Sequence, residues 1–194
     1  MKPHSVNQHN NFIAGWFMND LNICDDLIHL FEKSKEKYTG LTGTHKVVNK
    51  LVKDSTDLSI HSSSFAPPIK SYLKELSNIT KEYKKKYLYS DKDQCGWGIV
   101  ESFNIQRYLP KQGYHALHYE RNGIKSSSRL LTFMTYLNDV NDGGETEYYY
   151  QKVKIKPVKG LTLIVPVDWT FTHRGIVSLT ETKYIVTGWF SYLG

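Results

Sequence analysis

The spacing of apolar residues changes near residue 97, and this change constrains the fold more than any other feature of the sequence. Before it, apolar residues recur every three or four positions, as they do in amphipathic helices. After it, short runs rich in β-branched and aromatic residues alternate with turn signals such as Asn-Gly at 122–123 and Lys-Gly at 159–160. Strands joined by short turns, with no helical pattern between them, predict an antiparallel barrel or jelly roll.

Two amphipathic helices are predicted in the first half. One begins at Asp20, a predicted N-cap, and carries apolar residues at 21, 24, 27, 28 and 31. The other begins near Pro67 and carries its apolar stripe at 69, 72, 73, 76, 79 and 83. We expect the segment 39–66 between them to form loops with a strand or two. The lysine-rich run at 81–86 favours the solvated end of the second helix over a patch for an anionic partner.

Four strand-like runs are predicted in the second half, at 99–110, 130–137, 162–167 and 183–192. A chain of 194 residues fits one domain. We therefore expect residues 1–194 to form a single domain that is α+β but mainly β. About 1–95 would be helical support and loops, and about 96–194 would be the jelly-roll core.

Composition bears on the cellular setting. The net charge is +6, which permits acidic partners without requiring them, and the two cysteines lie far apart with no CxxC pair. Widely spaced cysteines are compatible with a reducing compartment. The first residues contain no apolar signal region, and no stretch approaches transmembrane length. We expect a cytoplasmic protein with no membrane partner.

One His-x-Glu triplet suggests a metal site. In a β-strand, His118 and Glu120 would point to the same face, and a histidine from a distant strand would complete a 2-His-1-carboxylate set for Fe(II). His173, in the loop that follows an apolar run, is the candidate for this third ligand. His115 would face the other way and is not expected to bind metal. Taken alone the triplet is weak, because a buried histidine is more often a hydrogen-bonded core residue than a ligand.

Lys183 opens the final strand, ten residues after His173. A cation within an apolar strand costs free energy unless an anion pairs with it. The alternative is an exposed lysine at the end of the strand, reaching into water. Its place close to a predicted iron ligand favours a carboxylate of a co-substrate as its partner.

Together, these motifs resemble the catalytic core of the prolyl 4-hydroxylase branch of 2-oxoglutarate oxygenases, over roughly 97–192. That family has an H-x-D pair, a Gly-Gly-Glu-Thr stretch, a distal histidine and a basic residue about ten positions further on. This chain has His118 and Glu120, the Gly-Gly-Glu-Thr stretch at 143–146, His173 and Lys183. The departure is Glu120 in place of Asp. Its extra methylene can move the carboxylate by more than the ~0.2 Å tolerance of a metal site unless the strand is displaced.

The resemblance implies a double-stranded β-helix, the jelly roll of this family, that uses Fe(II), 2-oxoglutarate and O2, with ascorbate as a supporting reductant. It implies an iron centre made of His118, Glu120 and His173. The implied co-substrate-binding residues are Lys183 for the distal carboxylate, the hydroxyl of Tyr136, Thr187, and Tyr108 near the metal. Ordinary core packing is the alternative for each tyrosine. Arg174 and Trp189 are candidates for substrate binding. Arg174 would line the substrate mouth or be exposed, and Trp189 would lie in the core or in the cavity wall.

The implied reaction is hydroxylation of a carbon centre, with a prolyl residue of a protein or peptide as the first candidate. A free amino acid or another small molecule stays open as the substrate. A nucleic-acid dealkylase is disfavoured, because those enzymes carry arginine where this chain has Lys183. A catalytically impaired jelly-roll binding module is the other alternative, with Glu120 as the mark of decay. We expect no nucleic-acid partner, and we expect the segments 39–66 and 121–128 to cover the substrate.

Overall fold

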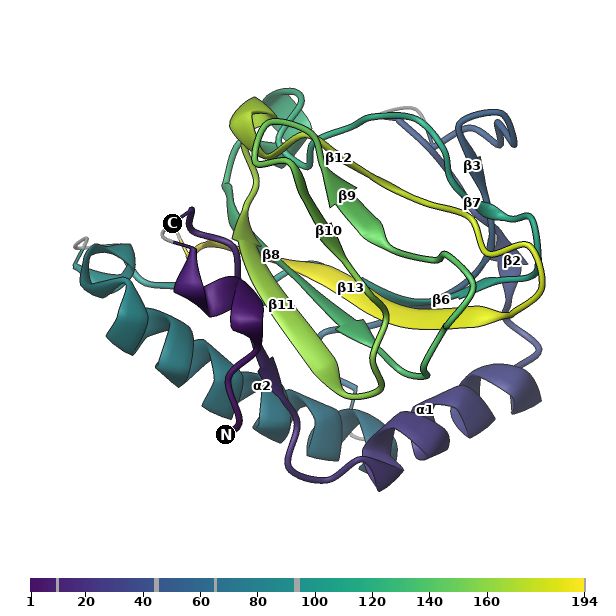
Figure 1. The fold of residues 1–194 in the computed structure, drawn as a ribbon. Coiled ribbons are helices and arrows are strands. Elements are labelled where there is room, and N and C mark those ends of the chain that lie inside the picture. Colours follow the sequence, from purple (N-terminus) through teal and green to yellow (C-terminus); the bar gives the residue numbers. More distant parts are fainter. Residues whose placement is uncertain (10, 44–45, 65, 93–94, 194) are drawn as a thin grey trace.

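The main sheet of the molecule is covered by two helices on one face and by smaller sheets on the other (Figure 1). A computed structural model describes residues 1–9, 11–43, 46–64, 66–92 and 95–193. Residues 44, 45 and 65 of the predicted covering segment 39–66 therefore lie outside the described residues. The jelly roll that the sequence predicts is confirmed by this arrangement of antiparallel strands.

The strands pair antiparallel throughout the sheets. The main sheet runs in the order β1 (Ala14–Phe17), β11 (Leu161–Pro166), β8 (Arg129–Tyr136), β13 (Lys183–Tyr192), β6 (Phe103–Tyr108), β4 (Thr56–Ile60) and β2 (Tyr38–Thr39), and β5 (Trp97–Gly98) pairs with β13. The minor sheets are β10 (Val153–Ile155), β9 (Thr146–Tyr148) and β12 (His173–Gly175), and the pair β3 (Lys53–Asp54) and β7 (Gly113–Tyr114). Short 3-10 helices are η1 (Ser5–Gln8), η2 (Leu88–Asp91), η3 (Ile124–Ser126) and η4 (Trp169–Phe171).

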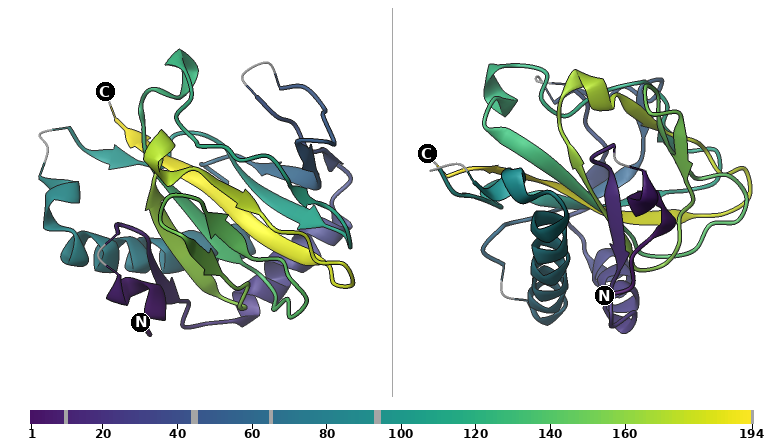
Figure 2. Two further views of the ribbon diagram at one scale, coloured as in Figure 1. Left: turned by 45° about the horizontal axis from the view of Figure 1, so that its top comes forward. Right: turned by 60° about the vertical axis from the view of Figure 1, so that its left-hand side comes forward.

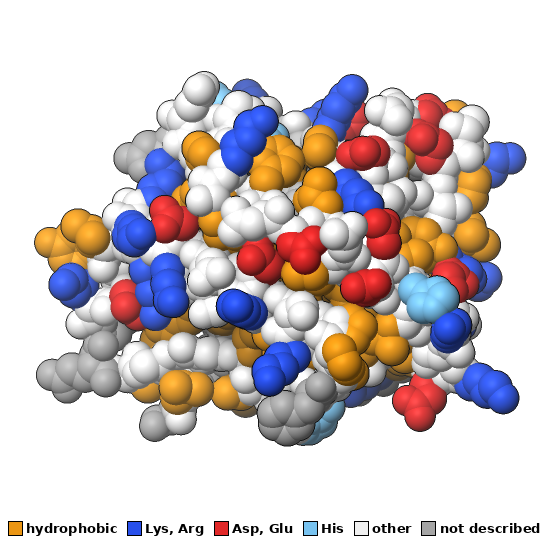
Figure 3. Space-filling view, turned by 90° about the horizontal axis from the view of Figure 1, so that it is seen from below, with side chains coloured by type: hydrophobic (Ala, Val, Ile, Leu, Met, Phe, Trp, Pro, Cys, Tyr) orange, Lys and Arg blue, Asp and Glu red, His pale blue; other side chains and the backbone are white. Residues whose placement is uncertain are grey.

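Both predicted helices are present, as α1 (Asn22–Lys33) and α2 (Pro67–Lys86), side by side under the main sheet (Figure 2). The N-cap of α1 is Leu21, which makes no side-chain cap, so the prediction of Asp20 as the N-cap is wrong by one residue. The side chain of Asp20 still accepts a hydrogen bond from the N–H of Asn22 at 3.0 Å. At the end of α2, Lys85 is exposed and pairs with Glu82. Acidic and basic side chains are interspersed over this face of the molecule (Figure 3), so the lysine run behaves as the solvated helix end that the sequence favours.

Two apolar cores lie on opposite faces of the main sheet. The first fills the space between helices and sheet, where Phe103, Phe133 and Phe190 pack edge-on or tilted. Burying each such ring contributes about 1.5–3 kcal/mol. The second core lies between the main sheet and the β9 sheet and includes Tyr108 and Tyr136. The candidate site opens beside this second core.

Some elements differ from the sequence expectations. Of the predicted strand-like run 99–110, only Phe103–Tyr108 forms a strand, β6, which pairs with the beginning of β13 and with β4. Strand β5 lies before this run and pairs with the end of β13. Strand β1 was not predicted, and it joins the main sheet through β11 although it precedes the helices. None of the helices in the described part of the chain is long and apolar enough to cross a membrane.

Candidate metal centre and co-substrate pocket

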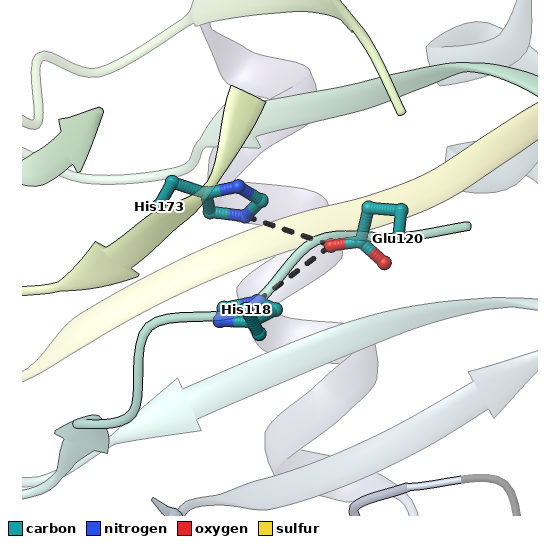
Figure 4. A group of neighbouring side chains, drawn as sticks. All are labelled: His118, Glu120 and His173. Carbon is teal, nitrogen blue, oxygen red and sulfur yellow. Dashed lines mark ion pairs between the residues drawn. The ribbon is translucent and has the colours of Figure 1, made fainter. Parts of the chain in front are cut away.

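Three side chains from two segments distant in sequence converge at one point (Figure 4). Ligand atoms of His118, Glu120 and His173 lie within 4.8 Å of one another. His173 opens β12, and it exchanges two backbone hydrogen bonds with His118, both at 2.9 Å. The backbone N–H of Glu120 donates to the carbonyl of Val167 at 3.1 Å.

The prediction that His118 and Glu120 lie on a regular strand is wrong. His118 forms only an isolated bridge to His173, and residues 119 and 120 belong to no strand. Their side chains still point the same way, because hydrogen bonds to β12 and to Val167 hold the backbone on both sides of the pair.

The hydrogen bonds of the two imidazoles set their tautomers. Nδ1 of His118 lies 3.0 Å from the carbonyl oxygen of Ala116, and Nδ1 of His173 lies 2.9 Å from that of Phe171. A carbonyl oxygen can only accept, so each Nδ1 carries the hydrogen, and the Nε2 of a neutral ring keeps a lone pair. These Nε2 atoms lie 3.7 and 3.5 Å from Oε1 of Glu120. Two imidazole nitrogens and one carboxylate oxygen form the donor set that suits non-haem Fe(II).

Burial and neighbouring side chains together set the protonation states of His118 and Glu120. Loss of hydration, together with the neighbouring His173, lowers the pKa of His118 to about 4, although Glu120 opposes the shift. Burial alone would raise the pKa of Glu120, but the imidazoles and the indole N–H of Trp189 outweigh it and bring the pKa to about 2. His118 is therefore neutral and Glu120 ionised at neutral pH. Metal binding requires these two states.

The ring of His118 is also fixed from the side. Tyr114 of β7 stacks on it with ring centroids 3.6 Å apart and an interplanar angle of 7°. Tyr148 of β9 lies in tilted contact with His173, with centroids 5.3 Å apart. Contacts of this kind limit the rotation of both imidazoles.

Lys183 lies inside the molecule, so the alternative of an exposed strand-end lysine is wrong. Only 6% of the residue is exposed, and its ammonium donates to the carbonyl of Gly144 at 2.8 Å. The ammonium also lies 5.2 Å from the ring centroid of Tyr108. Burial lowers the pKa of Lys183 to about 8, although the charge of Glu145 opposes the shift. An ammonium has three hydrogens to donate, and an anion in the cavity would satisfy those that point into it.

The Gly-Gly pair at 143–144 forms the turn that brings the carbonyl of Gly144 to the ammonium of Lys183. Gly143 and Gly144 have φ angles of +71° and +77°, in the left-handed region that side chains disfavour. A Cβ on Gly143 would also lie 2.4 Å from the carbonyl oxygen of Val177. The turn therefore needs glycine for its conformation and for its close packing.

A cavity of about 640 Å³ joins the metal ligands to Lys183. Of the residues predicted for the site, those that line it are His118, Glu120, His173, Lys183, Tyr108, Thr187 and Trp189. Tyr136 is fully buried, with its hydroxyl 2.7 Å from Oγ1 of Thr146, which lines the cavity. Arg174 pairs with Glu147 on the face of β12 opposite to His173, so the structure places it away from the cavity.

Residues 103–191 match the model of the 2OG-Fe(II) oxygenase superfamily. This segment therefore resembles the 2OG-Fe(II) oxygenases. Prolyl 4-hydroxylase 13 of Arabidopsis thaliana is 26% identical over 59% of this chain and 57% of its own length. Probable prolyl 4-hydroxylase 9 of the same plant is 31% identical over 46% of this chain and 40% of its own length. The chain thus spans about half the length of the curated relatives it matches.

Solved prolyl hydroxylases share the fold of this chain. The viral collagen prolyl hydroxylase of Paramecium Bursaria Chlorella virus-1, in complex with 2OG, superposes with a TM-score of 0.70 at 20% identity and covers 95% of this chain and 98% of its own. A prolyl hydroxylase of Trichoplax adhaerens, in complex with a hypoxia inducible factor peptide fragment, has a TM-score of 0.72 at 17% identity. It covers 94% of this chain and 84% of its own. The predicted resemblance and fold class are confirmed. The predicted cofactor Fe(II) and co-substrate 2-oxoglutarate are both part of the name of the matched superfamily.

A buried ion pair in the cavity was missed by the sequence analysis. Lys53 and Asp57 lie 2.5 Å apart, both almost fully buried, and both line the cavity. Gln106 donates to Asp57 at 3.2 Å and accepts a hydrogen bond from the hydroxyl of Tyr108 at 2.8 Å. The hydrogen of Tyr108 is thus directed at Gln106, and its hydroxyl would have to turn to donate to a co-substrate. The sequence signal was faint, because the pair lies in a polar segment where a lysine and an aspartate are ordinary.

Proposed function

We propose that this chain is an Fe(II)- and 2-oxoglutarate-dependent dioxygenase that hydroxylates a prolyl residue of a protein or peptide. The observation that carries the proposal is one cavity holding both the His118, Glu120 and His173 cluster and the buried ammonium of Lys183. Fe(II) bound there, with 2-oxoglutarate and O2, would supply the oxidation of a C–H bond to C–OH, with succinate and CO2 as co-products. The protein supplies binding, orientation and shelter from water.

Lys183 is the proposed anchor of the co-substrate. A dicarboxylate that reaches from the metal centre to this ammonium would make a charge-assisted hydrogen bond in a buried setting. Thr187 and Tyr108 line the same cavity and are proposed to contact the co-substrate, while Tyr136 supports it through Thr146. Ascorbate is proposed as a supporting reductant.

The proposed substrate is a prolyl residue within a polypeptide. The named relatives are prolyl 4-hydroxylases, and the Trichoplax adhaerens hydroxylase was solved with a peptide. In this chain, residues 41–43 and 46 reach the cavity from one segment and residues 122, 123, 125 and 126 from another. These segments are proposed to cover a bound peptide. Residues 1–194 are proposed to act as one oxygenase domain.

Anaerobic titration with Fe(II) and 2-oxoglutarate tests the proposal. Wild-type protein is expected to develop a metal-to-ligand charge-transfer band and to release succinate with proline-containing peptides in air. His118→Ala should lose both, whereas His115→Ala should keep both, because His115 lies outside the ligand cluster. A wild type without the band would refute the proposal. A band that appears only in Glu120→Asp would support an impaired binding module instead.

A further inference from the structure

The two carboxylate oxygens of Glu120 have different surroundings. Oε1 faces both imidazoles, at 3.7 Å from His118 Nε2 and 3.5 Å from His173 Nε2. Oε2 accepts a hydrogen bond from the indole Nε1 of Trp189 at 2.8 Å. An indole N–H can only donate, so this bond holds Oε2 away from the imidazoles. Trp189 belongs to β13, so the carboxylate is tied to the central strand of the main sheet.

Trp189 is itself held in place. The guanidinium of Arg129 lies 3.6 Å from the indole centroid, a close cation–π contact. Nε and Nη2 of Arg129 donate to the two carboxylate oxygens of Glu101 at 2.9 and 2.7 Å, so the guanidinium plane is fixed by a bidentate pair. Its Nη1 donates to the backbone carbonyl of Glu120 at 3.0 Å. Arg129 therefore braces the Trp189 ring and the Glu120 backbone together.

Glutamate needs such support more than aspartate would. Its side chain has one more rotatable bond, and ordering that bond costs free energy. An unrestrained glutamate could also turn both oxygens toward the imidazoles. We propose that Trp189, clamped by Arg129 and Glu101, is a positioning residue that orients Glu120 so that a single carboxylate oxygen faces the metal site. This inference rests on the metal centre of the proposed function.

Trp189→Phe removes the N–H donor but keeps an aromatic ring under Arg129. Loss of a group that orients a metal ligand lowers affinity about 10–100-fold. We expect a loss of this size for Mn(II) and Zn(II) in calorimetric titrations, and a changed visible absorption spectrum of the Co(II) form. Trp97→Phe is the matched control, because Trp97 donates to the carbonyl of Ser90 at 2.7 Å and pairs with the same strand. It should leave both metal readouts unchanged.

A double-mutant cycle separates orientation of Glu120 from general support of the fold. In a Glu120→Asp background the shorter side chain ends farther from the indole, so adding Trp189→Phe should change metal affinity less than about threefold. An equal loss in both backgrounds would overturn the positioning role.

Wild-type protein that binds metal while Trp189→Phe binds it equally well would overturn only this inference. Wild-type protein that binds no metal would overturn it together with the proposed function. Circular dichroism shows whether each variant is folded. If Trp189→Phe does not fold, Arg129→Met replaces it, and metal affinity equal to wild type would then overturn the inference.

Discussion

Replacing Lys183 with methionine is expected to stabilise the protein without co-substrate while abolishing 2-oxoglutarate binding. Burial lowers the pKa of Lys183 from 10.5 to about 8. Each unit corresponds to ~1.4 kcal/mol, so holding the ammonium charged in the fold at neutral pH costs roughly 3 kcal/mol. Loss of the hydrogen bond from Lys183 to Gly144 lowers the free energy of unfolding by about 1 kcal/mol. The net gain in free energy of unfolding at pH 7 is therefore roughly 2 kcal/mol.

This gain must depend on pH in a definite direction. The pKa of Lys183 is about 8 in the folded protein and about 10.4 in an unfolded chain. Between these values the unfolded chain binds more protons, so wild-type stability rises with pH there. The penalty is fully present below about pH 8 and is lost by about pH 10.5. The advantage of Lys183→Met should therefore be largest at pH 7 and shrink as the solution becomes alkaline.

Urea unfolding of wild type and Lys183→Met at about pH 7 and pH 9.5 measures this difference. Subtracting the wild type removes the contribution of other titrating groups, and Lys81→Met, at an exposed position of α2, is the matched control. Adding Mn(II) and 2-oxoglutarate should stabilise the wild type but not Lys183→Met. The reasoning would be refuted if Lys183→Met were less stable than wild type at pH 7. It would also be refuted if the stability advantage of the variant were the same at both pH values.

Two further predictions concern packing and the buried ion pair. Lys53→Met or Asp57→Leu alone should lower the free energy of unfolding by about 3–5 kcal/mol, because the remaining charge stays buried without its partner. Urea unfolding should show a much smaller cost for the joint replacement, and additive costs would contradict this account. Gly188→Ala should lower it by about 1–3 kcal/mol, since the added methyl would lie 2.5 Å from both Phe103 and Phe133. An unchanged thermal midpoint would contradict this account, because it would mean that both phenylalanines move aside at no cost in stability.

The long elements of the fold could be predicted because each buries one continuous apolar face. Strand β13 was expected at 183–192 and is observed at Lys183–Tyr192, and β8 differs from its prediction by one residue at each end. Helix α2 begins at Pro67 as the sequence predicts. Apolar residues that repeat regularly along such elements predict the helix or strand even when its packing partners are unknown.

The short elements around the site could not be predicted in this way. Strands β3, β7, β9 and β12 are two or three residues long, and a period cannot be recognised over so few positions. Their conformation depends on pairing with distant segments, as Lys53 does with Tyr114. The convergence of His118 and Glu120 likewise depends on hydrogen bonds to His173 and Val167, which lie about fifty residues away.

What made the site recognisable was a conflict with the local pattern. Lys183 begins a strand whose other residues are mostly apolar or β-branched, so its charge stood out in the sequence and predicted an anionic partner. Lys53 is as deeply buried beside the same cavity, yet four polar residues follow it and its charge was unremarkable in sequence. A buried charge is therefore visible in a single sequence only where the surrounding pattern is strong. In the irregular segments that line this cavity, burying a charge costs the same free energy, but only the tertiary contacts show that the charge is buried.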